Sequence, residues 1–237
     1  MCGRYTLNQP AQALAETFGI EEVLDLKPQF NIAPTQMVAT ILHDTETEKR
    51  ELRQLRWGLI PSWAKDPSIG AKMINARAET VAEKPSFRAA FKRRRCLVVA
   101  DGFYEWQQQP KKKQPFYFRL QDAQPFGFAG LWEKWQSPEG EEIATCTILT
   151  TNANELMLSV HHRMPVILHP KDYDLWLNPQ LSASDTLQQL LQPYSPEAMT
   201  AYPVSTIVNS PKNNNPECIV PLGERVGRGG GTPPVQE

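Results

Sequence analysis

Hydrophobic and polar positions along the chain form many short strand-like runs and a few short helical patterns. In residues 10–18, "PAQALAETF", Leu14 and Phe18 are four positions apart and share one helix face. Pro10 suits the first turn of a helix, and Gly19 suits its C-terminal cap. The pattern therefore predicts a short helix over residues 10–18.

Two strand-like runs, residues 36–44 and 51–60, flank a polar turn near "DTETEK" and predict a hairpin. The segment 86–95, "SFRAAFKRRR", predicts a helix with Ser86 as its N-cap. Its basic C-terminal end is favourable against the helix dipole.

Strands dominate the middle of the chain, and short helices follow them. Predicted strands cover residues 96–106, 114–120, 125–135 and 142–151, predicted helices cover 171–177 and 182–192, and residues 202–209 are expected to be extended. Strands outnumber helices and do not alternate regularly with them. The pattern therefore predicts an α+β fold, in which a curved, mostly antiparallel sheet or barrel-like core carries short flanking helices.

Length and composition fit one globular domain. The chain has 237 residues, of which 41% are hydrophobic, enough for a substantial core. We find no internal repeat and no shift in composition that would divide it. We therefore expect a single domain over residues 1–224, followed by a disordered tail over the Gly/Pro-rich residues 225–237.

Charge and targeting signals exclude few functions. The formal net charge of -1 neither supports nor excludes nucleic-acid binding, because local patches decide it. No run is long enough to span a membrane, and the N-terminus lacks a signal-peptide pattern. We expect a cytoplasmic monomer without a membrane partner, associated with the nucleoid if bacterial.

Cysteine and histidine spacing argues against a metal site. The four cysteines lie far apart with no CxxC pair, and the four histidines lack ligand spacing, so we expect no metal and no cofactor. Cys96 and Cys146 lie in apolar runs and are expected to be buried and reduced, and Cys218 is expected to be similar.

Cys2 stands apart by its position. Methionine removal is efficient when residue 2 is small, so Cys2 would gain a free α-amine, with a pKa of about 7.7–8.0, beside a thiol with a pKa of about 8.5. Such an aminothiol can attack an acyl carbon with its sulfur. Alternatively, its amine can form a Schiff base with an aldehyde, and the thiol can then close a thiazolidine ring. The competing interpretation is an accidental cysteine in a frayed, exposed terminus.

Polar residues in otherwise apolar segments are further candidates. In "KMINARAET", an extended backbone would place Asn75, Arg77 and Glu79 on one face, although Asn75 alternatively caps a turn. Glu105 follows a predicted strand between two aromatic residues, a setting that suits proton transfer near neutral pH; alternatively it is a solvated charge at a strand end. His161 precedes His162, and histidine is the usual proton shuttle, although at least one of the two is expected to be structural.

An ordered set of motifs runs through nearly the whole chain and resembles the SRAP (SOS response-associated peptidase) family up to about residue 215. The matching stretches are "MCGRY", "FNIAPTQ", "RWGLIPSWAKD", "INARAET", "CLVVADGFYEW", "QPFYF", "FAGLWE", "TILTTNAN", "HHRMPVIL" and "VSTIVNSPKNN". The resemblance implies recognition of abasic sites in single-stranded DNA. It also implies a covalent thiazolidine crosslink that shields the lesion, and autoproteolytic removal of Met1 to expose Cys2.

Carried over by position, the resemblance implies Cys2, Asn75, Glu105 and His161 as the catalytic set. His161, not His162, matches the H-x-R-x-P pattern. As hypotheses, His161 donates a proton to the opening sugar ring, Glu105 shuttles protons during imine formation, and Asn75 holds the α-amine or a sugar hydroxyl.

DNA contacts are expected from residues beside this set. Arg4, Arg77 and Arg163 are candidates for phosphate contacts, and the alternative for each is a surface ion pair. Trp63 and Trp106 are candidates for stacking on unpaired bases, and the alternative is ordinary core packing.

Three other functions stay open. "MCG" also opens class II glutamine amidotransferases, but Arg4 follows here and the chain has neither an NG nor a GD dipeptide. A non-enzymatic DNA-binding module would make Cys2 incidental. A general cysteine peptidase is permitted by a Cys–His pair, but no oxyanion motif or substrate pocket is recognisable in the sequence.

Overall fold

The computed structural model describes residues 2–21 and 26–223. The predicted tail, residues 225–237, and Met1 lie outside the described residues. Within the described part, no helix combines the length and apolar character needed to cross a membrane.

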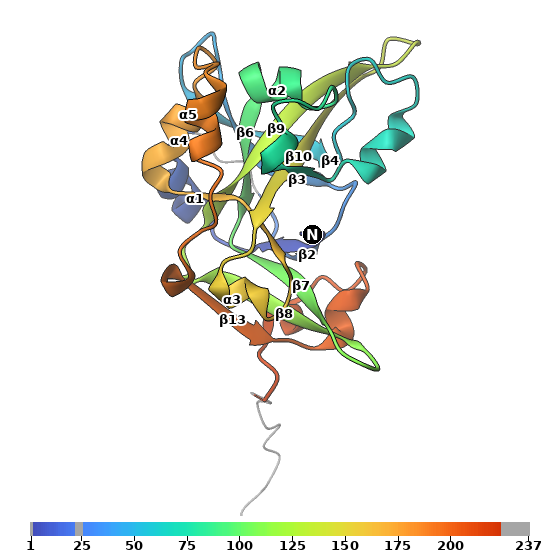
Figure 1. Cartoon of the computed structure of the whole chain (residues 1–237), viewed down its shortest axis with the longest axis vertical. Helices are drawn as coiled ribbons and strands as arrows, with labels where there is room; N and C mark the ends of the chain where they lie inside the picture. Colours follow the sequence, from blue (N-terminus) through green and yellow to red (C-terminus); the bar gives the residue numbers. More distant parts are fainter. Residues whose placement is uncertain (1, 22–25, 224–237) are drawn as a thin grey trace, which may run out of the picture.

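A five-stranded barrel forms the larger half of the molecule (Figure 1). Its strands are β3 (Met37–His43), β4 (Arg50–Trp57), β6 (Arg95–Ala100), β9 (Phe126–Gln136) and β10 (Glu142–Asn152). β10 pairs with both β9 and β4, which closes the ring of five strands. Among the five pairings of this ring, only β4–β10 is parallel. The predicted hairpin is confirmed as β3–β4, with Val38 opposite Leu55.

A second, antiparallel sheet lies below the barrel in Figure 1. Its order is β13 (Met199–Pro203), β8 (Lys113–Leu120), β7 (Gly102–Gln108), β1 (Tyr5–Leu7) and β2 (Gln29–Ile32). Only Asp101 separates β6 from β7, so the chain passes from the barrel directly into this sheet. Three short strands extend the barrel wall: β5 (Asn75–Arg77), β11 (Arg163–Pro165) and β12 (Ile167–Leu168).

Short helices flank the strands. They are α1 (Ala11–Phe18), α2 (Arg88–Arg93), α3 (Glu155–Leu158), α4 (Tyr173–Leu177) and α5 (Ser184–Gln189), with 3-10 turns η1 (Pro67–Lys72), η2 (Ala78–Thr80), η3 (Pro170–Asp172), η4 (Pro196–Ala198), η5 (Thr206–Asn209) and η6 (Pro216–Ile219). The helix predicted over 10–18 is confirmed: Leu14 and Phe18 are buried, and Gly19 closes it in the left-handed region at φ 61°. The predicted α+β class with a mostly antiparallel barrel is also confirmed.

Both ends of the helix predicted over residues 86–95 are wrong. Phe87, not Ser86, occupies the N-cap of α2, without a side-chain cap, and the helix ends at Arg93. Arg95 instead opens β6 as a buried cation. Its guanidinium donates to five backbone carbonyls, those of Phe91, Lys92, Trp176, Asn178 and Leu181. The basic residues at the end of the predicted helix are therefore not all exposed, because Arg95 is buried and connects α2 to α4.

The segment predicted to be extended over 202–209 is only partly so. β13 ends at Pro203, and Thr206–Asn209 forms the 3-10 turn η5. The Ser205 side chain accepts a hydrogen bond from the Ile207 backbone N–H, which starts this turn.

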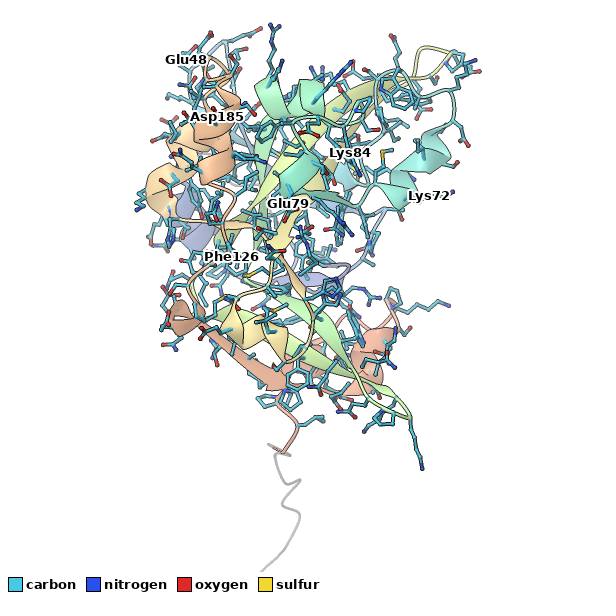
Figure 2. All side chains as sticks on the ribbon, viewed as in Figure 1. Glu48, Lys72, Glu79, Lys84, Phe126 and Asp185 are labelled. Carbon is cyan, nitrogen blue, oxygen red and sulfur yellow. The ribbon has the colours of Figure 1, made fainter. Side chains whose placement is uncertain are left out.

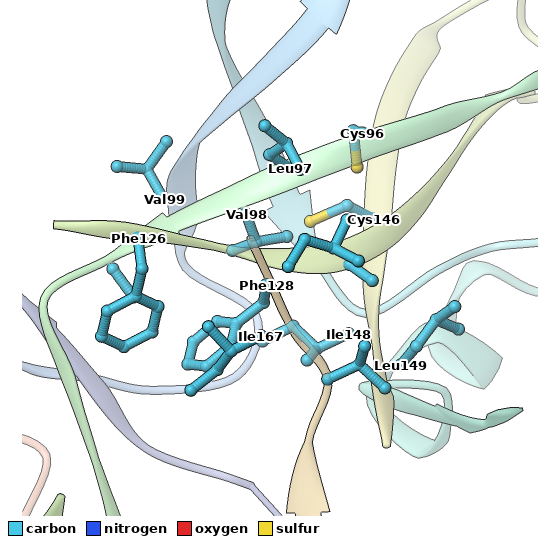
Figure 3. Close-up of a cluster of buried hydrophobic side chains, with 14 of the residues drawn as sticks. Cys96, Leu97, Val98, Val99, Phe126, Phe128, Cys146, Ile148, Leu149 and Ile167 are labelled. Atoms are coloured by element: carbon cyan, nitrogen blue, oxygen red, sulfur yellow. The ribbon is translucent and has the colours of Figure 1, made fainter. Parts of the chain in front are cut away.

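The core fills the barrel and continues between the barrel and the second sheet. Figure 3 shows Cys96 and Cys146 among aliphatic and aromatic side chains from β6, β9 and β10. Both cysteines and Cys218 are buried and free of disulfides, as predicted. A Cβ on Gly130 of β9 would lie 2.9 Å from the Cys96 Sγ, so only glycine fits there.

Candidate functional site

Cys2 is buried shortly before the first strand, β1, and is not exposed in a frayed terminus. β1 begins three residues later and pairs on both sides, with Tyr5 opposite Ile32 of β2 and Phe103 of β7. The Arg4 carbonyl also accepts a hydrogen bond of 3.0 Å from the Tyr104 N–H. The Cys2 side chain has no exposed surface. The sheet therefore holds residue 2 at one place between the barrel and the second sheet.

Asn75 fixes the Cys2 backbone directly. Its Nδ2 donates a 2.8 Å hydrogen bond to the Cys2 carbonyl oxygen. β5 holds Asn75 in register, because it runs parallel to β10 with Asn75 opposite Ile148. The buried Asn75 Oδ1 has no hydrogen-bond partner among the described residues. Asn75 thus holds Cys2 through the carbonyl group, and it carries a further acceptor.

Glu105 lies in the middle of β7, not after a strand, and its side chain is 5% exposed. Tyr104 and Trp106 do not enclose it. Their rings contact each other with centroids 6.4 Å apart, since neighbours of Glu105 along a strand point to the opposite face. The two aromatic residues that flank Glu105 in the sequence therefore do not hold its carboxyl group.

The charge of Glu105 reaches the Cys2 sulfur. Burial, with the Glu105 carboxylate as the second cause, raises the pKa of the Cys2 thiol to about 12. With Met1 attached, this sulfur is therefore protonated at pH 7, and the expectation of a partly ionised thiol after Met1 removal stays a prediction. Any step that uses it as a nucleophile requires a base.

His161 completes the cluster. Its Nδ1 lies 3.0 Å from the Arg163 backbone N and 3.2 Å from the Arg163 carbonyl oxygen, so the backbone of residue 163 orients the ring. Burial lowers the pKa of His161, and the nearby Glu105 carboxylate opposes this shift. His162 stacks on His161 with ring centroids 4.4 Å apart. At neutral pH the ring is mostly uncharged and can both accept and donate a proton.

An open groove of about 850 Å³ reaches Glu105 and His161, whereas Cys2 and Asn75 are not among its lining residues. It is lined by Arg4, Glu105, Trp106, Gln108, Lys113, Leu158, Val160, His161, His162 and Asn209. Four predicted site residues therefore share one cavity: Arg4, Glu105, Trp106 and His161. An anionic, unpaired strand with flat bases matches this mixture of cations and rings.

Trp106 and Arg4 form one wall of the groove. The Trp106 Nε1 donates to the Asn209 Oδ1 at 2.8 Å, and the Arg4 guanidinium lies 5.8 Å from the Trp106 ring centroid. Arg4 also donates to the Asn31 Oδ1 at 2.7 Å and to the Val208 carbonyl at 2.8 Å. Arg4 is therefore held in place while it borders the cavity.

The other predicted DNA-contact residues lie in different settings. Trp63 is 59% exposed, so ordinary core packing is wrong for it, but it does not line the groove. Arg77 is exposed at the end of β5. Arg163 is buried, and its guanidinium forks onto the carboxylate of Glu79 with bonds of 2.6 and 2.9 Å.

Glu79 does not share a face with Asn75 and Arg77, because β5 ends at Arg77 and Glu79 lies in η2. The sequence does not reveal its pairing with Arg163, since no local pattern indicates a partner 84 positions away. Sequence reasoning also misses Asn31, although it lies in the family motif "FNIAPTQ". Asn31 donates to the carbonyls of Val208, Ser210 and Asn213 and so fastens the groove wall to β2.

The reactive side chains at this place belong to Cys2, Glu105 and His161, a thiol, a carboxyl group and an imidazole. Within residues 2–21 and 26–223, no group of three or more His, Cys, Asp or Glu side chains is placed to hold a metal ion. The three side chains together offer a nucleophile and two groups that can move protons.

Comparisons with known proteins agree on one family. The profile of the family "SOS response associated peptidase (SRAP)" matches residues 1–211. The chain is 52% identical over 223 residues to the abasic site processing protein YoqW of Bacillus subtilis (strain 168), which covers 92% of this chain and 99% of the relative. It is 35% identical over 226 residues to the abasic site processing protein HMCES of Gallus gallus, covering 83% of this chain and 67% of the relative.

A solved structure shares the fold. The crystal structure of a Bacteroides thetaiotaomicron protein aligns with a TM-score of 0.82 at 30% identity, covering 93% of this chain and 99% of that one. With a family match over nearly all described residues and the fold in agreement, the chain belongs to the SOS response associated peptidase (SRAP) family.

Proposed function

We propose that this protein recognises abasic sites in single-stranded DNA and captures them covalently through Cys2, which shields the lesion. The main support is the convergence of three elements on residue 2. Asn75 donates a 2.8 Å hydrogen bond to its carbonyl, the Glu105 carboxylate acts on its thiol, and His161 lines the same groove as Glu105. The names of the relatives, abasic site processing proteins, support the same substrate.

Removal of Met1 comes first, because only then does Cys2 carry a free α-amine. We propose that the protein performs this cleavage itself and that Glu105 and His161 move the protons, because the Glu105 carboxylate acts electrostatically on both the Cys2 thiol and the His161 ring. The unpartnered Asn75 Oδ1 is then an acceptor for the new amine, while Nδ2 keeps the carbonyl fixed.

The capture of the sugar is a condensation that releases one water. His161 donates a proton to the ring oxygen while the C1′ hydroxyl group gives its proton to Glu105, and the deoxyribose opens to its C1′ aldehyde. The α-amine adds to C1′, and one of its N–H protons passes to the C1′ oxygen. Glu105 then protonates this hydroxyl group, which leaves as water, and takes up the remaining N–H proton as the imine forms. The sulfur then adds to C1′, while the thiol proton passes through Glu105 to the nitrogen, and a five-membered thiazolidine results.

The high pKa of the Cys2 thiol supports one order of these steps, in which the amine attacks before the sulfur. With a pKa of about 12, almost no thiolate exists at pH 7, whereas an ordinary α-amine has a pKa of about 7.7–8.0. The amine therefore attacks first, and sulfur closes the ring once Glu105 can accept its proton. A general acid–base group in this role typically contributes about 10²–10⁴-fold to a rate.

The groove supplies the contacts to DNA. We assign phosphate contacts to Arg4, which borders the groove, and to Arg77, which is exposed beside Asn75. Trp106 and the exposed Trp63 are assigned to base stacking. Arg163 is the exception among the predicted contacts, since its guanidinium is already bound to Glu79.

A denaturing gel tests this function. The purified protein is mixed with a single-stranded oligonucleotide carrying one abasic site, and Cys2→Ala and a form that retains Met1 are run beside it. We expect a slower band with the wild-type protein and no such band with either control. Protection of the oligonucleotide by Cys2→Ala without a band in any lane would instead support a non-covalent DNA-binding module.

A further inference from the structure

The ring of His161 is oriented through a neighbour that the reaction does not use. Its Nδ1 contacts the backbone N–H and carbonyl of residue 163, at 3.0 and 3.2 Å. The position of the ring therefore depends on where Arg163 lies. Arg163 belongs to the three-residue strand β11, whose pairing with β10 places it opposite Asn152.

The side chain of Arg163 anchors that short strand. Its guanidinium is buried and donates to the Asn152 Oδ1 at 3.0 Å and to the Thr150 carbonyl at 2.6 Å, both on β10. The guanidinium also forms the fork onto Glu79. A bidentate pair with a carboxylate fixes both the position and the plane of a guanidinium. Loss of the partner of a buried cation strongly destabilises the folded protein.

Glu79 connects this anchor to the segment that holds Cys2. It lies four positions after Asn75, whose Nδ2 binds the Cys2 carbonyl. Figure 2 shows Glu79 near the centre of the view, on the barrel side of the second sheet. The short segment 75–79 thus has two contacts with the site. Its first residue, Asn75, binds Cys2, and its last residue, Glu79, binds Arg163, which orients the His161 ring.

We propose that Glu79 is a positioning residue for the crosslinking reaction, which acts by holding Arg163 and through it the His161 ring beside Glu105 and Cys2. Glu79 has this role only if the proposed crosslinking reaction takes place. The Glu79 carboxylate itself is about half exposed and touches no group that reacts. Its bond to Arg163 lowers the pKa of Glu79, so the pair is charged at neutral pH.

The test compares Glu79→Gln with a matched control, Glu142→Gln. Glu142 is 56% exposed and pairs with Lys134 at 3.0 Å on the β9–β10 hairpin, so the control removes a similarly exposed carboxylate whose partner, unlike Arg163, is also exposed. Single-turnover crosslinking is measured at saturating DNA. Non-covalent affinity is measured with an oligonucleotide that carries a tetrahydrofuran in place of the abasic sugar, which has no aldehyde. We expect Glu79→Gln to slow crosslinking by about 10- to 100-fold with unchanged affinity, and Glu142→Gln to change neither.

Two further readouts separate positioning from a general structural role. The Arg163 backbone contact raises the pKa of His161, so its loss moves the His161 limb of the pH–rate profile to lower pH in Glu79→Gln. The other charged groups that act on the pKa of this ring are Glu105 from β7, the N-terminal amine and His162. Arg4 and Lys113 line the same groove, and all of these groups are unchanged in the variant. In addition, His161→Ala with Glu79→Gln is expected to be no slower than His161→Ala alone.

Three outcomes overturn the role of Glu79: a normal rate in Glu79→Gln, an affinity loss equal to the rate loss, or additive effects in the double variant. Absence of crosslinking by the wild-type protein contradicts the proposed function itself and is therefore distinguishable from these three.

Discussion

Asn75→Ala removes a side-chain contact that fixes the Cys2 backbone. The lost bond is 2.8 Å long and ends on the carbonyl of a fully buried residue. A buried acceptor left without its donor costs about 1–3 kcal/mol. If the hydrogen bond stabilises the transition state of crosslinking by this amount, its loss slows crosslinking by about 5- to 150-fold, because about 1.4 kcal/mol corresponds to a tenfold change in rate.

The assay is single-turnover crosslinking at saturating DNA, together with the melting temperature and the affinity for tetrahydrofuran DNA. Asn75→Asp keeps the size of the side chain but lacks the donor, so its rate is expected to fall at least as far. Asn178→Ala is the control, because it loses a 2.9 Å bond to the Gln180 N–H beyond the end of α4. A lower melting temperature with an unchanged crosslinking rate would refute the reasoning, because the bond would then stabilise the fold alone.

Three further predictions concern proton transfer, the thiol and DNA stacking. Glu105→Ala and His161→Ala are expected to slow crosslinking by about 10²–10⁴-fold, and a parallel loss of affinity for tetrahydrofuran DNA would contradict their assignment as acid–base groups. The pKa of the Cys2 thiol is raised to about 12 by folding, so its contribution to stability is complete below about pH 8.5 and is lost as the pH rises towards 12. Chemical denaturation should therefore show a smaller alkaline loss of stability in Cys2→Ala than in wild type, and an identical loss would argue against the buried neutral thiol. Trp63→Ala is expected to weaken non-covalent DNA binding by about 1–3 kcal/mol per stacked base without changing the melting temperature, because the ring is 59% exposed; unchanged affinity would remove Trp63 from the interface.

Local patterns predict the fold where local forces decide it. The helix ending at Gly19 and the β3–β4 hairpin follow from apolar spacing and turn chemistry, and both are present. Ser86 fails as a cap because the helix starts later in the chain, at Arg88. Arg95 does not end the helix predicted over 86–95, because five carbonyls from α2, α4 and the segment after α4 converge on its guanidinium, which no local pattern contains.

The candidate site depends on contacts between distant parts of the chain. Family motifs name Cys2, Asn75, Glu105 and His161, but periodicity cannot bring positions so far apart into one cluster. The position of Cys2 near the terminus suggests exposure, yet pairing of β1 on both sides buries it. The raised pKa of the Cys2 thiol follows from burial and from Glu105 and is therefore visible only in the structure; the proposed amine-first order rests on it.

The most direct test of covalent capture is the intact mass of the adduct formed with an abasic oligonucleotide, without any added reductant. A thiazolidine at Cys2 predicts the mass of the protein lacking Met1 plus that of the oligonucleotide, minus one water. It also predicts that the modified peptide begins at Cys2 and no longer reacts with a thiol-alkylating reagent. An adduct on a protein that retains Met1, or no adduct at all, would contradict the account.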